Sequence, residues 1–258
     1  MNKILFSDFD GTLFFKEGFH QEDIEAIKTF QSKGNKFALC TGRPLGGVNA
    51  LMKGKIIPDY YVLCTGSLVL DKDYQVIYAQ EIPFELVKEV CQKYENETII
   101  GPHCLDEKYL YFKYFPNDAP SYIKQFDSID EFIKRDLEVI KVEAFSHDAD
   151  EIQRVLPYFK DMKNIAYLSS YPDNVEITNE YAQKGLILEK VIDLLNIKKE
   201  EVIVLGDGMN DITLFERFPY SFAPSNGEKA IQEKAYQVVC SCEDGAVSEA
   251  IEYALENL

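Results

Sequence analysis

Two aspartates, Asp8 and Asp10, stand one residue apart directly after the short apolar run of residues 4–6. Side chains alternate across a strand, so a strand continuing through this run would put both carboxylates on one side and Phe9 on the other. Two like charges at that spacing repel each other unless a cation lies between them or one carboxyl keeps its proton. The pair therefore predicts a metal site or a proton-transfer site, with an ordinary Asx turn as the plain alternative.

Strand-like and helix-like patterns alternate at both ends of the chain. Residues 20–34 carry apolar side chains at helical spacing, with acids in the first turn and Gly34 as a stop, which predicts an amphipathic helix. Buried strands are expected over residues 4–6, 36–40 and 60–64, with a short helix over 43–52. From residue 184 the alternation returns as helix 184–195, strand 201–205, helix 210–218, strand 220–223 and helix 246–255. Strands separated by helices predict a parallel sheet.

The stretch between these two ends mixes polar and apolar residues more evenly. Strands are expected over residues 109–112 and 138–145, and helices over 84–94 and 148–159. We therefore expect one α/β core domain, built from residues 1–80 and 184–258, interrupted by a smaller α/β cap domain. The cap covers residues 81–183, and its sheet is expected to carry helices on one side.

Composition argues against several classes of function. The 258 residues carry a net charge of −17, with 27 basic and 44 acidic side chains, and nucleic acid is bound mainly by clustered Lys and Arg. No apolar run approaches the roughly 20 residues of a membrane helix and no secretion signal opens the chain, so we expect a cytoplasmic protein without a membrane partner. Six cysteines without paired spacing and three histidines give zinc no support. The expected oligomeric state is a monomer or a weak homodimer.

Four polar segments fall just beyond the carboxyl ends of the predicted parallel strands, where such sheets bind ligands. They are Asp8-Phe9-Asp10, Thr41-Gly42-Arg43, Lys184, and the run GDGMND over residues 206–211. Acidic, hydroxyl and ammonium groups that converge in one crevice suit a divalent cation together with a phosphate. Each segment alone has an ordinary interpretation as a turn or a solvated helix start.

In that order, DFDGTL, TGR, Lys184 within QKG, and GDGMND resemble the four motifs of the haloacid dehalogenase superfamily of phosphohydrolases. The long insertion between the second and third motifs resembles its Cof-type branch. The resemblance covers nearly the whole chain and implies a Rossmann-like parallel-sheet core with an inserted α/β cap. Two segments depart from the branch pattern. Thr65-Gly66-Ser67 replaces a usual Asn-Gly pair, and Ala223-Pro224-Ser225-Asn226-Gly227 stands where the branch tends to carry a Met-Gly-Asn-Ala-like run.

The resemblance also implies roles for individual residues. Asp8 is expected to attack phosphorus as the nucleophile and to form an aspartyl phosphate, with Asp10 as the general acid and base. The expected cofactor is Mg²⁺, held by the Asp8 carboxylate, the Asp10 backbone carbonyl and the Asp207 carboxylate. Such an ion would offset the repulsion between the two aspartates.

The remaining polar groups are expected to bind phosphate. This set comprises the Phe9 and Gly42 amides, the Thr41 hydroxyl, the Lys184 ammonium and the Asn210 side chain. Asp211 is expected to orient either Lys184 or a metal-bound water. The sequence leaves two interpretations of Arg43 open, a phosphate contact and a structural salt bridge.

Together these roles imply a Mg²⁺-dependent phosphatase acting on a small phosphorylated metabolite, in particular a sugar or polyol phosphate. A sugar-phosphate mutase, as in phosphomannomutases, is the enzymatic alternative, and release of free phosphate distinguishes the two. A non-catalytic phosphosugar-binding regulator is the alternative from another class, and it would not need both Asp8 and Asp10.

Substrate specificity is expected on the cap, in the segment just ahead of Lys184. The candidate contacts are Tyr171, Asp173, Asn174 and Glu176, and an ordinary hairpin turn is the alternative for the same residues. The cap is also expected to open and close over the core, admitting substrate and excluding water.

Overall fold

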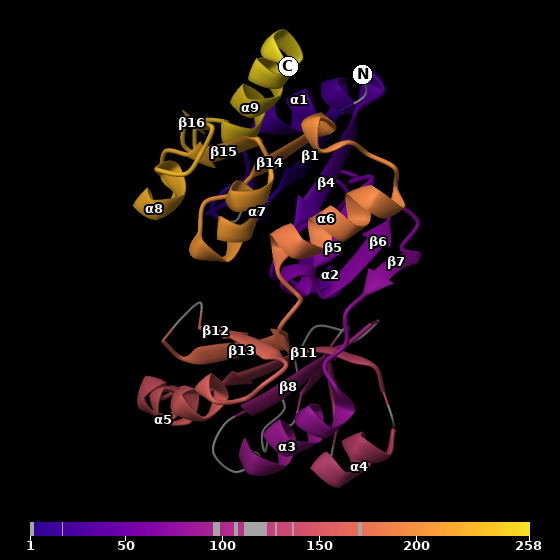
Figure 1. Ribbon diagram of the computed structural model, residues 1–258, viewed down its shortest axis with the longest axis vertical. Coiled ribbons are helices and arrows are strands. Elements are labelled where there is room, and N and C mark those ends of the chain that lie inside the picture. Colours follow the sequence, from indigo (N-terminus) through magenta and orange to yellow (C-terminus); the bar gives the residue numbers. More distant parts are fainter. Residues whose placement is uncertain are drawn as a thin grey trace. The chain divides into compact units, whose positions relative to one another are not determined.

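The computed structural model describes residues 3–16, 18–94, 99–105, 108–110, 123–126, 128–135, 137–169 and 172–258. The chain divides into two compact units, drawn in Figure 1. The first unit consists of Met1–Arg43, Gly47–Tyr78 and Gln183–Leu258, and the second of Pro44–Gly46 and Ala79–Ala182. Among the described residues, no helix is long and apolar enough to cross a membrane.

An eight-stranded sheet forms the centre of the first unit. Its strand order is β16 (Gln237–Val239), β15 (Tyr220–Pro224), β14 (Val202–Leu205), β1 (Ile4–Ser7), β4 (Lys36–Cys40), β5 (Tyr60–Leu63), β6 (Leu68–Asp71) and β7 (Val76–Ala79). Pairing is parallel from β16 to β5, as the alternation of strands and helices predicts. Between β5 and β6 it is antiparallel, because a tight turn reverses the chain there, and the sequence patterns did not predict β6 or β7.

Helices cover both faces of this sheet. On one face, apolar residues of α6 (Lys184–Leu194) and α7 (Ile212–Arg217) share a buried cluster with Phe6, Ala38 and Val204. On the other face α1 (Gln21–Ser32) and α9 (Ala246–Asn257) lie side by side (Figure 1) and contact β4 and β14. Because helices shield both faces, β1 and β14 are apolar at every position except Ser7 rather than alternating.

Short elements complete the first unit. They are the hairpin β2 (Phe14–Phe15) and β3 (Gly18–Phe19), helices α2 (Leu45–Met52) and α8 (Lys229–Gln232), and single 3₁₀ turns at Cys64–Gly66, Lys199–Glu201 and Met209–Asp211.

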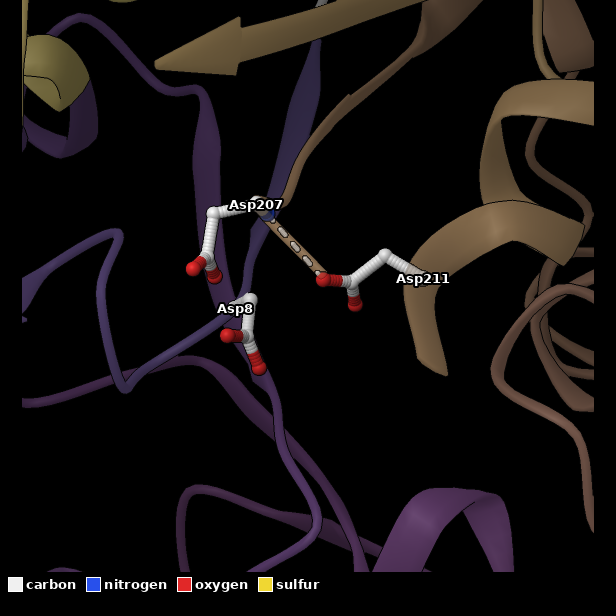
Figure 2. A group of neighbouring side chains, drawn as sticks. All are labelled: Asp8, Asp207 and Asp211. Atoms are coloured by element: carbon white, nitrogen blue, oxygen red, sulfur yellow. Dashed lines mark hydrogen bonds between the residues drawn. The ribbon is translucent and has the colours of Figure 1, made fainter. Parts of the chain in front are cut away.

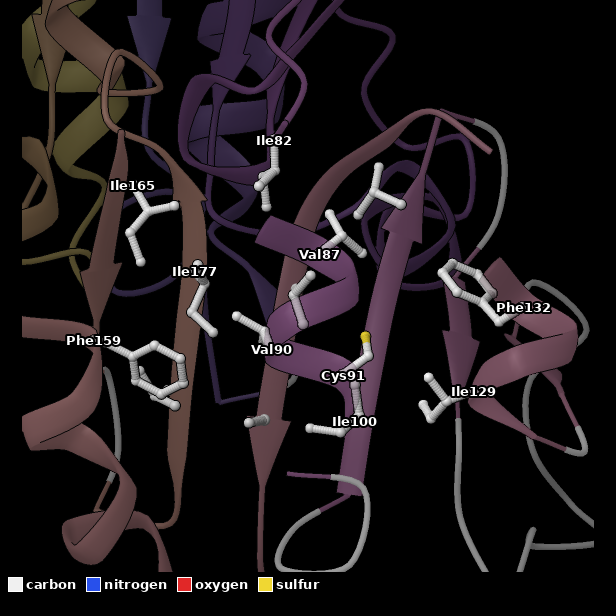
Figure 3. Close-up of a cluster of buried hydrophobic side chains, with 14 of the residues drawn as sticks. Ile82, Val87, Val90, Cys91, Ile100, Ile129, Phe132, Phe159, Ile165 and Ile177 are labelled. Carbon is white, nitrogen blue, oxygen red and sulfur yellow. The ribbon is translucent and has the colours of Figure 1, made fainter. Parts of the chain in front are cut away.

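A six-stranded, mainly antiparallel sheet forms the second unit. Its order is β10 (Ile123–Gln125), β9 (Lys108–Leu110), β8 (Ile99–Cys104), β11 (Val139–Phe145), β13 (Asn174–Asn179) and β12 (Ile165–Leu168). Apolar side chains of α3 (Phe84–Tyr94), α4 (Ile129–Lys134) and α5 (Ala149–Lys160) pack on one face, and Figure 3 shows Val87, Val90 and Cys91 of α3 among them. Residues 111–112 of the strand predicted over 109–112 lie outside the described residues.

Strand register brings the polar segments of the first unit to one edge. Ser7 is paired with both Leu39 of β4 and Leu205 of β14, so all three strands end at the same level. The backbone N–H of Asp8 continues the ladder by donating to the Leu205 carbonyl at 2.8 Å. The segments that follow these strands must therefore emerge together.

Candidate active site

One buried lysine joins two aspartates at this edge. Asp8 is the first residue after β1 and is 4% exposed. The Lys184 Nζ atom, at the start of α6, lies 2.7 Å from Asp8 Oδ1 and 2.6 Å from Asp211 Oδ1. Lys184 and Asp211 are both fully buried. Of the two roles expected for Asp211, the contact is with Lys184.

The buried charges of this group do not balance. Burial raises the pKa of Asp8 well above its ordinary range; Lys184 opposes that rise, and the charges of Asp211 and Asp207 add to it. Burial and the Asp211 charge likewise raise the pKa of Asp207. Burial alone would lower the pKa of Lys184, but Asp211 and Asp8 hold it above its ordinary value. Three carboxylates facing one ammonium leave a site that favours a further cation.

The three carboxyl groups also converge closely enough to hold that cation. Asp8, Asp207 and Asp211 each place one oxygen within 4.8 Å of the others. Figure 2 shows Asp8 on one segment and Asp207 and Asp211 on another, the one that follows β14. Asp211 Oδ2 already accepts hydrogen bonds from the backbone N–H groups of Asp207 and Gly208, at 3.1 and 3.2 Å. Because Asp211 already accepts these hydrogen bonds, Asp8 and Asp207 are the better placed metal ligands. Carboxylate oxygens suit Mg²⁺.

Asp10 lies in different surroundings from Asp8. Because β1 ends at Ser7 and a turn follows, strand alternation does not extend to Asp10, and the placement of both carboxylates on one side stays a prediction. The Asp10 side chain is half exposed, and both of its oxygens accept from Arg43, Nε to Oδ2 and Nη2 to Oδ1, each at 2.7 Å. Each aspartate therefore faces its own basic side chain.

Apart from Lys184, the residues expected to bind phosphate follow β1, β4 and β14. Thr41 is buried, and its Oγ1 accepts the Arg43 backbone N–H at 3.1 Å, which leaves the hydroxyl able to donate. Gly42 is half buried in the same turn. The Phe9 ring is buried and stacks on Phe14 with 5.1 Å between centroids. Asn210 lies in the 3₁₀ turn Met209–Asp211.

A strained turn after β5 is hydrogen-bonded to the backbone of the Thr41 segment. Cys64 and Thr65 have φ values of 50° and 61°, in the left-handed region that non-glycine residues seldom adopt. The Thr65 N–H donates to the Thr41 carbonyl at 3.0 Å, and the Cys64 N–H to the Arg43 carbonyl at 3.1 Å. The departure at Thr65-Gly66-Ser67 therefore lies against the candidate site.

Asn226 is a supporting residue to which the sequence analysis assigned no role. Its Nδ2 donates to the Gly11 carbonyl and its Oδ1 accepts the Cys242 N–H, both at 2.8 Å. From the loop after β15, it thereby ties the turn after β1 to the loop after β16. The position of Asn226 after a further strand of the parallel sheet was the signal that could have identified it.

The cap residues expected to select the substrate lie in or beside a hairpin. Tyr171 is outside the described residues, and Asp173 lies in the turn between the antiparallel strands β12 and β13. On β13, Glu176 pairs with the buried Lys141 at 2.8 Å, Nζ to Oε2, and Asn174 is mostly buried. The backbone here forms the hairpin that was the alternative interpretation. A role of these residues in substrate specificity stays a prediction.

Comparisons with protein families, with curated proteins and with solved structures all agree on one family. The family model of haloacid dehalogenase-like hydrolases matches residues 5–251. A 5-amino-6-(5-phospho-D-ribitylamino)uracil phosphatase of Bacillus subtilis is 26% identical, covering 98% of both chains. A haloacid dehalogenase-like hydrolase from Bacteroides thetaiotaomicron has a TM-score of 0.87 at 21% identity, over 98% of this chain and 100% of the other. A subclass IIB sugar phosphatase has a TM-score of 0.79 at 24% identity, over 98% and 99%. The expected family and fold class are confirmed.

Proposed function

Because this chain belongs to the haloacid dehalogenase-like hydrolases and is a phosphatase of that family, we propose that it hydrolyses small phosphomonoesters through an aspartyl phosphate. The observation that carries the proposal is the buried Asp8 carboxylate, held 2.7 Å from Lys184 Nζ at the carboxyl end of β1. A carboxylate held in this way is oriented and shielded from water, as a nucleophile toward phosphorus requires.

In the first step, the Asp8 carboxylate attacks phosphorus. A bond forms between a carboxylate oxygen and phosphorus, the bond from phosphorus to the substrate oxygen breaks, and Asp10 gives its proton to the departing alkoxide. In the second step, water attacks phosphorus while Asp10 takes a proton from that water. A bond forms between the water oxygen and phosphorus, and the bond between phosphorus and the Asp8 oxygen breaks. Inorganic phosphate leaves, and both aspartates return to their starting states.

The other residues of the site position phosphate and balance its charge. Lys184 offsets negative charge beside Asp8, while the Thr41 hydroxyl, the amides of Phe9 and Gly42, and Asn210 donate to phosphate oxygens. The Asp8 and Asp207 carboxylates and the Asp10 backbone carbonyl would hold Mg²⁺. When bound, that ion neutralises charge that develops on the phosphoryl group.

Sugar and polyol phosphates are the substrates we propose. Two relatives support this choice, one named for a ribityl phosphate compound and one as a sugar phosphatase. The second unit is proposed to select among them, with four residues in or beside the β12–β13 hairpin as candidate contacts: Tyr171, Asp173, Asn174 and Glu176.

A phosphate-release assay with a panel of sugar, polyol and nucleotide phosphates tests the function. We expect inorganic phosphate to appear with Mg²⁺ present, to cease after chelation and to return when Mg²⁺ is restored. Release of free phosphate separates hydrolysis from a mutase reaction and from silent binding. Product formation without free phosphate would contradict the proposal.

The role of Asp8 needs its own matched pair of variants. Asp8→Asn should abolish turnover, and the parent protein, quenched during turnover, should yield a hydroxylamine-sensitive phosphate adduct that the variant lacks. Asp193→Asn, an exposed substitution near the end of α6, serves as the control and should behave as the parent. An adduct that persists in Asp8→Asn would place the nucleophile elsewhere.

A further inference from the structure

The ion pair between Asp10 and Arg43 has a geometry that fixes the orientation of the Asp10 carboxylate. Two parallel hydrogen bonds of 2.7 Å engage both oxygens of the carboxylate. A forked contact of this kind fixes the plane of the carboxylate as well as its distance. Yet the side chains remain 39% and 50% exposed, and exposed pairs add little to folding stability. Stability is therefore a poor explanation for the precision of the contact.

Arg43 is itself held in place by the residues around it. Its backbone N–H donates to Thr41 Oγ1, and its carbonyl accepts the Cys64 N–H from the strained turn. The guanidinium carbon lies 5.8 Å from the centre of the Phe9 ring, a fully buried ring that stacks on Phe14. The backbone of Arg43 is thus held by hydrogen bonds, and its guanidinium group lies beside a buried aromatic ring.

We propose that Arg43 is a positioning residue, whose fork holds the Asp10 carboxyl group in the orientation from which it exchanges a proton with the leaving group and with water. The inference rests on the proposed function, because it concerns the same reaction. A direct phosphate contact is the competing role for Arg43.

The leaving group distinguishes the two roles. Departure of a sugar alkoxide needs a proton from Asp10, whereas nitrophenolate departs with little assistance. The ratio kcat/KM reports steps up to the first irreversible one, the loss of the leaving group. We expect Arg43→Met to lower kcat/KM for a sugar phosphate about 10- to 100-fold, within the range of acid catalysis, and that for 4-nitrophenyl phosphate by less than about threefold. Arg43→Lys, which lacks the fork, should fall between the parent and Arg43→Met.

A double-mutant cycle shows whether Arg43 acts through Asp10. In an Asp10→Asn background, Arg43→Met should cause no further loss of kcat/KM toward the sugar phosphate, because the group that it orients is already disabled. Arg135→Met is the matched control, since Arg135 forms a similarly exposed pair with Glu131 at 2.6 Å in α4. That control should leave both substrates unaffected. Thermal unfolding of each variant verifies that it is folded.

Equal losses for both substrates, or losses that multiply in the double variant, would overturn the positioning role and assign Arg43 to phosphate. In either case the parent protein still releases phosphate and the proposed function stands. A parent protein that releases no phosphate from either substrate would overturn both proposals together.

Discussion

The candidate site contains two ion-paired regions of nearly equal geometry in opposite surroundings. The buried floor consists of Asp8, Lys184 and Asp211, with contacts of 2.6 and 2.7 Å and side chains at most 6% exposed. The exposed rim consists of Asp10 and Arg43, with contacts of 2.7 Å. The distances barely differ, so burial must decide what each pair contributes.

Burial gives the ion pairs of the floor a larger effect on folding stability than the ion pair of the rim. Charges in the floor have lost their water, and removing one partner leaves the others without compensation. Charges in the rim keep much of their hydration, so loss of a partner is met by solvent. The same kind of contact therefore has a large effect on stability in one region and a small effect in the other, and the following changes test that contrast.

Removing the lysine of the floor should have the largest effect. Lys184→Met keeps the length of the side chain but leaves Asp8 and Asp211 buried without a cation. We expect the free energy of unfolding at pH 7 to fall by about 3–5 kcal/mol, measured by urea denaturation. Lys190→Met, an exposed substitution on the same helix, is the control and should change it by less than about 0.5 kcal/mol. A loss as small as the control's would mean that the floor is as well hydrated as the rim.

Asp23 extends the contrast to a buried carboxylate without a lysine. Its Oδ1 accepts the Ser248 N–H at 2.7 Å, and burial, partly opposed by that bond, raises its pKa to about 6. The folded state binds this proton more tightly than the unfolded state, whose pKa is about 3.8. The contribution of Asp23 to stability is thus fully present below about pH 4 and is lost as the pH rises through about 6.

The measurement compares the parent with Asp23→Asn at several pH values. Between pH 4 and pH 7, the unfolding free energy of the variant should rise relative to that of the parent by about 2.4 kcal/mol. Asp193→Asn, an exposed control, should show a constant difference across the series. Parallel curves for Asp23→Asn and the parent would contradict the raised pKa.

Gly11 tests the backbone next to the floor. Its φ is +78°, and an added Cβ would collide with Asp207 Oδ2. Gly54 has a φ of +73°, but no described atom lies within 4 Å of its added Cβ. Gly54→Ala should therefore lower stability by about 1 kcal/mol through the backbone alone, and Gly11→Ala by roughly twice that. Only Gly11→Ala should also suppress phosphate release; equal effects would show that the collision is relieved.

A substitution at Thr65 should raise stability, in contrast to the glycine substitutions. Asparagine tolerates the left-handed region better than a β-branched residue, so Thr65→Asn should raise the unfolding free energy by about 1 kcal/mol. The expected rise in Tm is about 2–4 °C. Lys53→Asn, at a φ of 48° on an exposed turn, should gain less because lysine is not β-branched. A decrease in stability would show that the threonine side chain makes compensating contacts.

The rim should show the smallest effect on stability. Arg43→Met is expected to change the unfolding free energy by less than about 1 kcal/mol, and the matched exposed pair in Arg135→Met should respond alike. A loss close to that of Lys184→Met would erase the distinction between floor and rim.

The sequence alone determined the family, the polar segments of the site and most helices and strands of the first unit. Local patterns suffice for these, because apolar spacing encodes helix and strand, and short polar motifs follow strand ends. The strands at 36–40 and 60–64 and the helices on either side of β14 were predicted within a few residues. Strands β6 and β7 were missed; β6 follows a left-handed turn built from Cys64 and Thr65, which carries no recognised turn signal.

Only the tertiary structure decided which cation meets which carboxylate. Asp8 and Lys184 are 176 residues apart, and their contact depends on the packing of α6 against the sheet that contains β1. The sequence left Arg43 between two roles, and the fold brought its fork to Asp10. Local patterns specify what each segment becomes, whereas partners and burial follow from packing between distant segments. Because burial sets the energy of an ion pair, the contrast between floor and rim is a property of the fold.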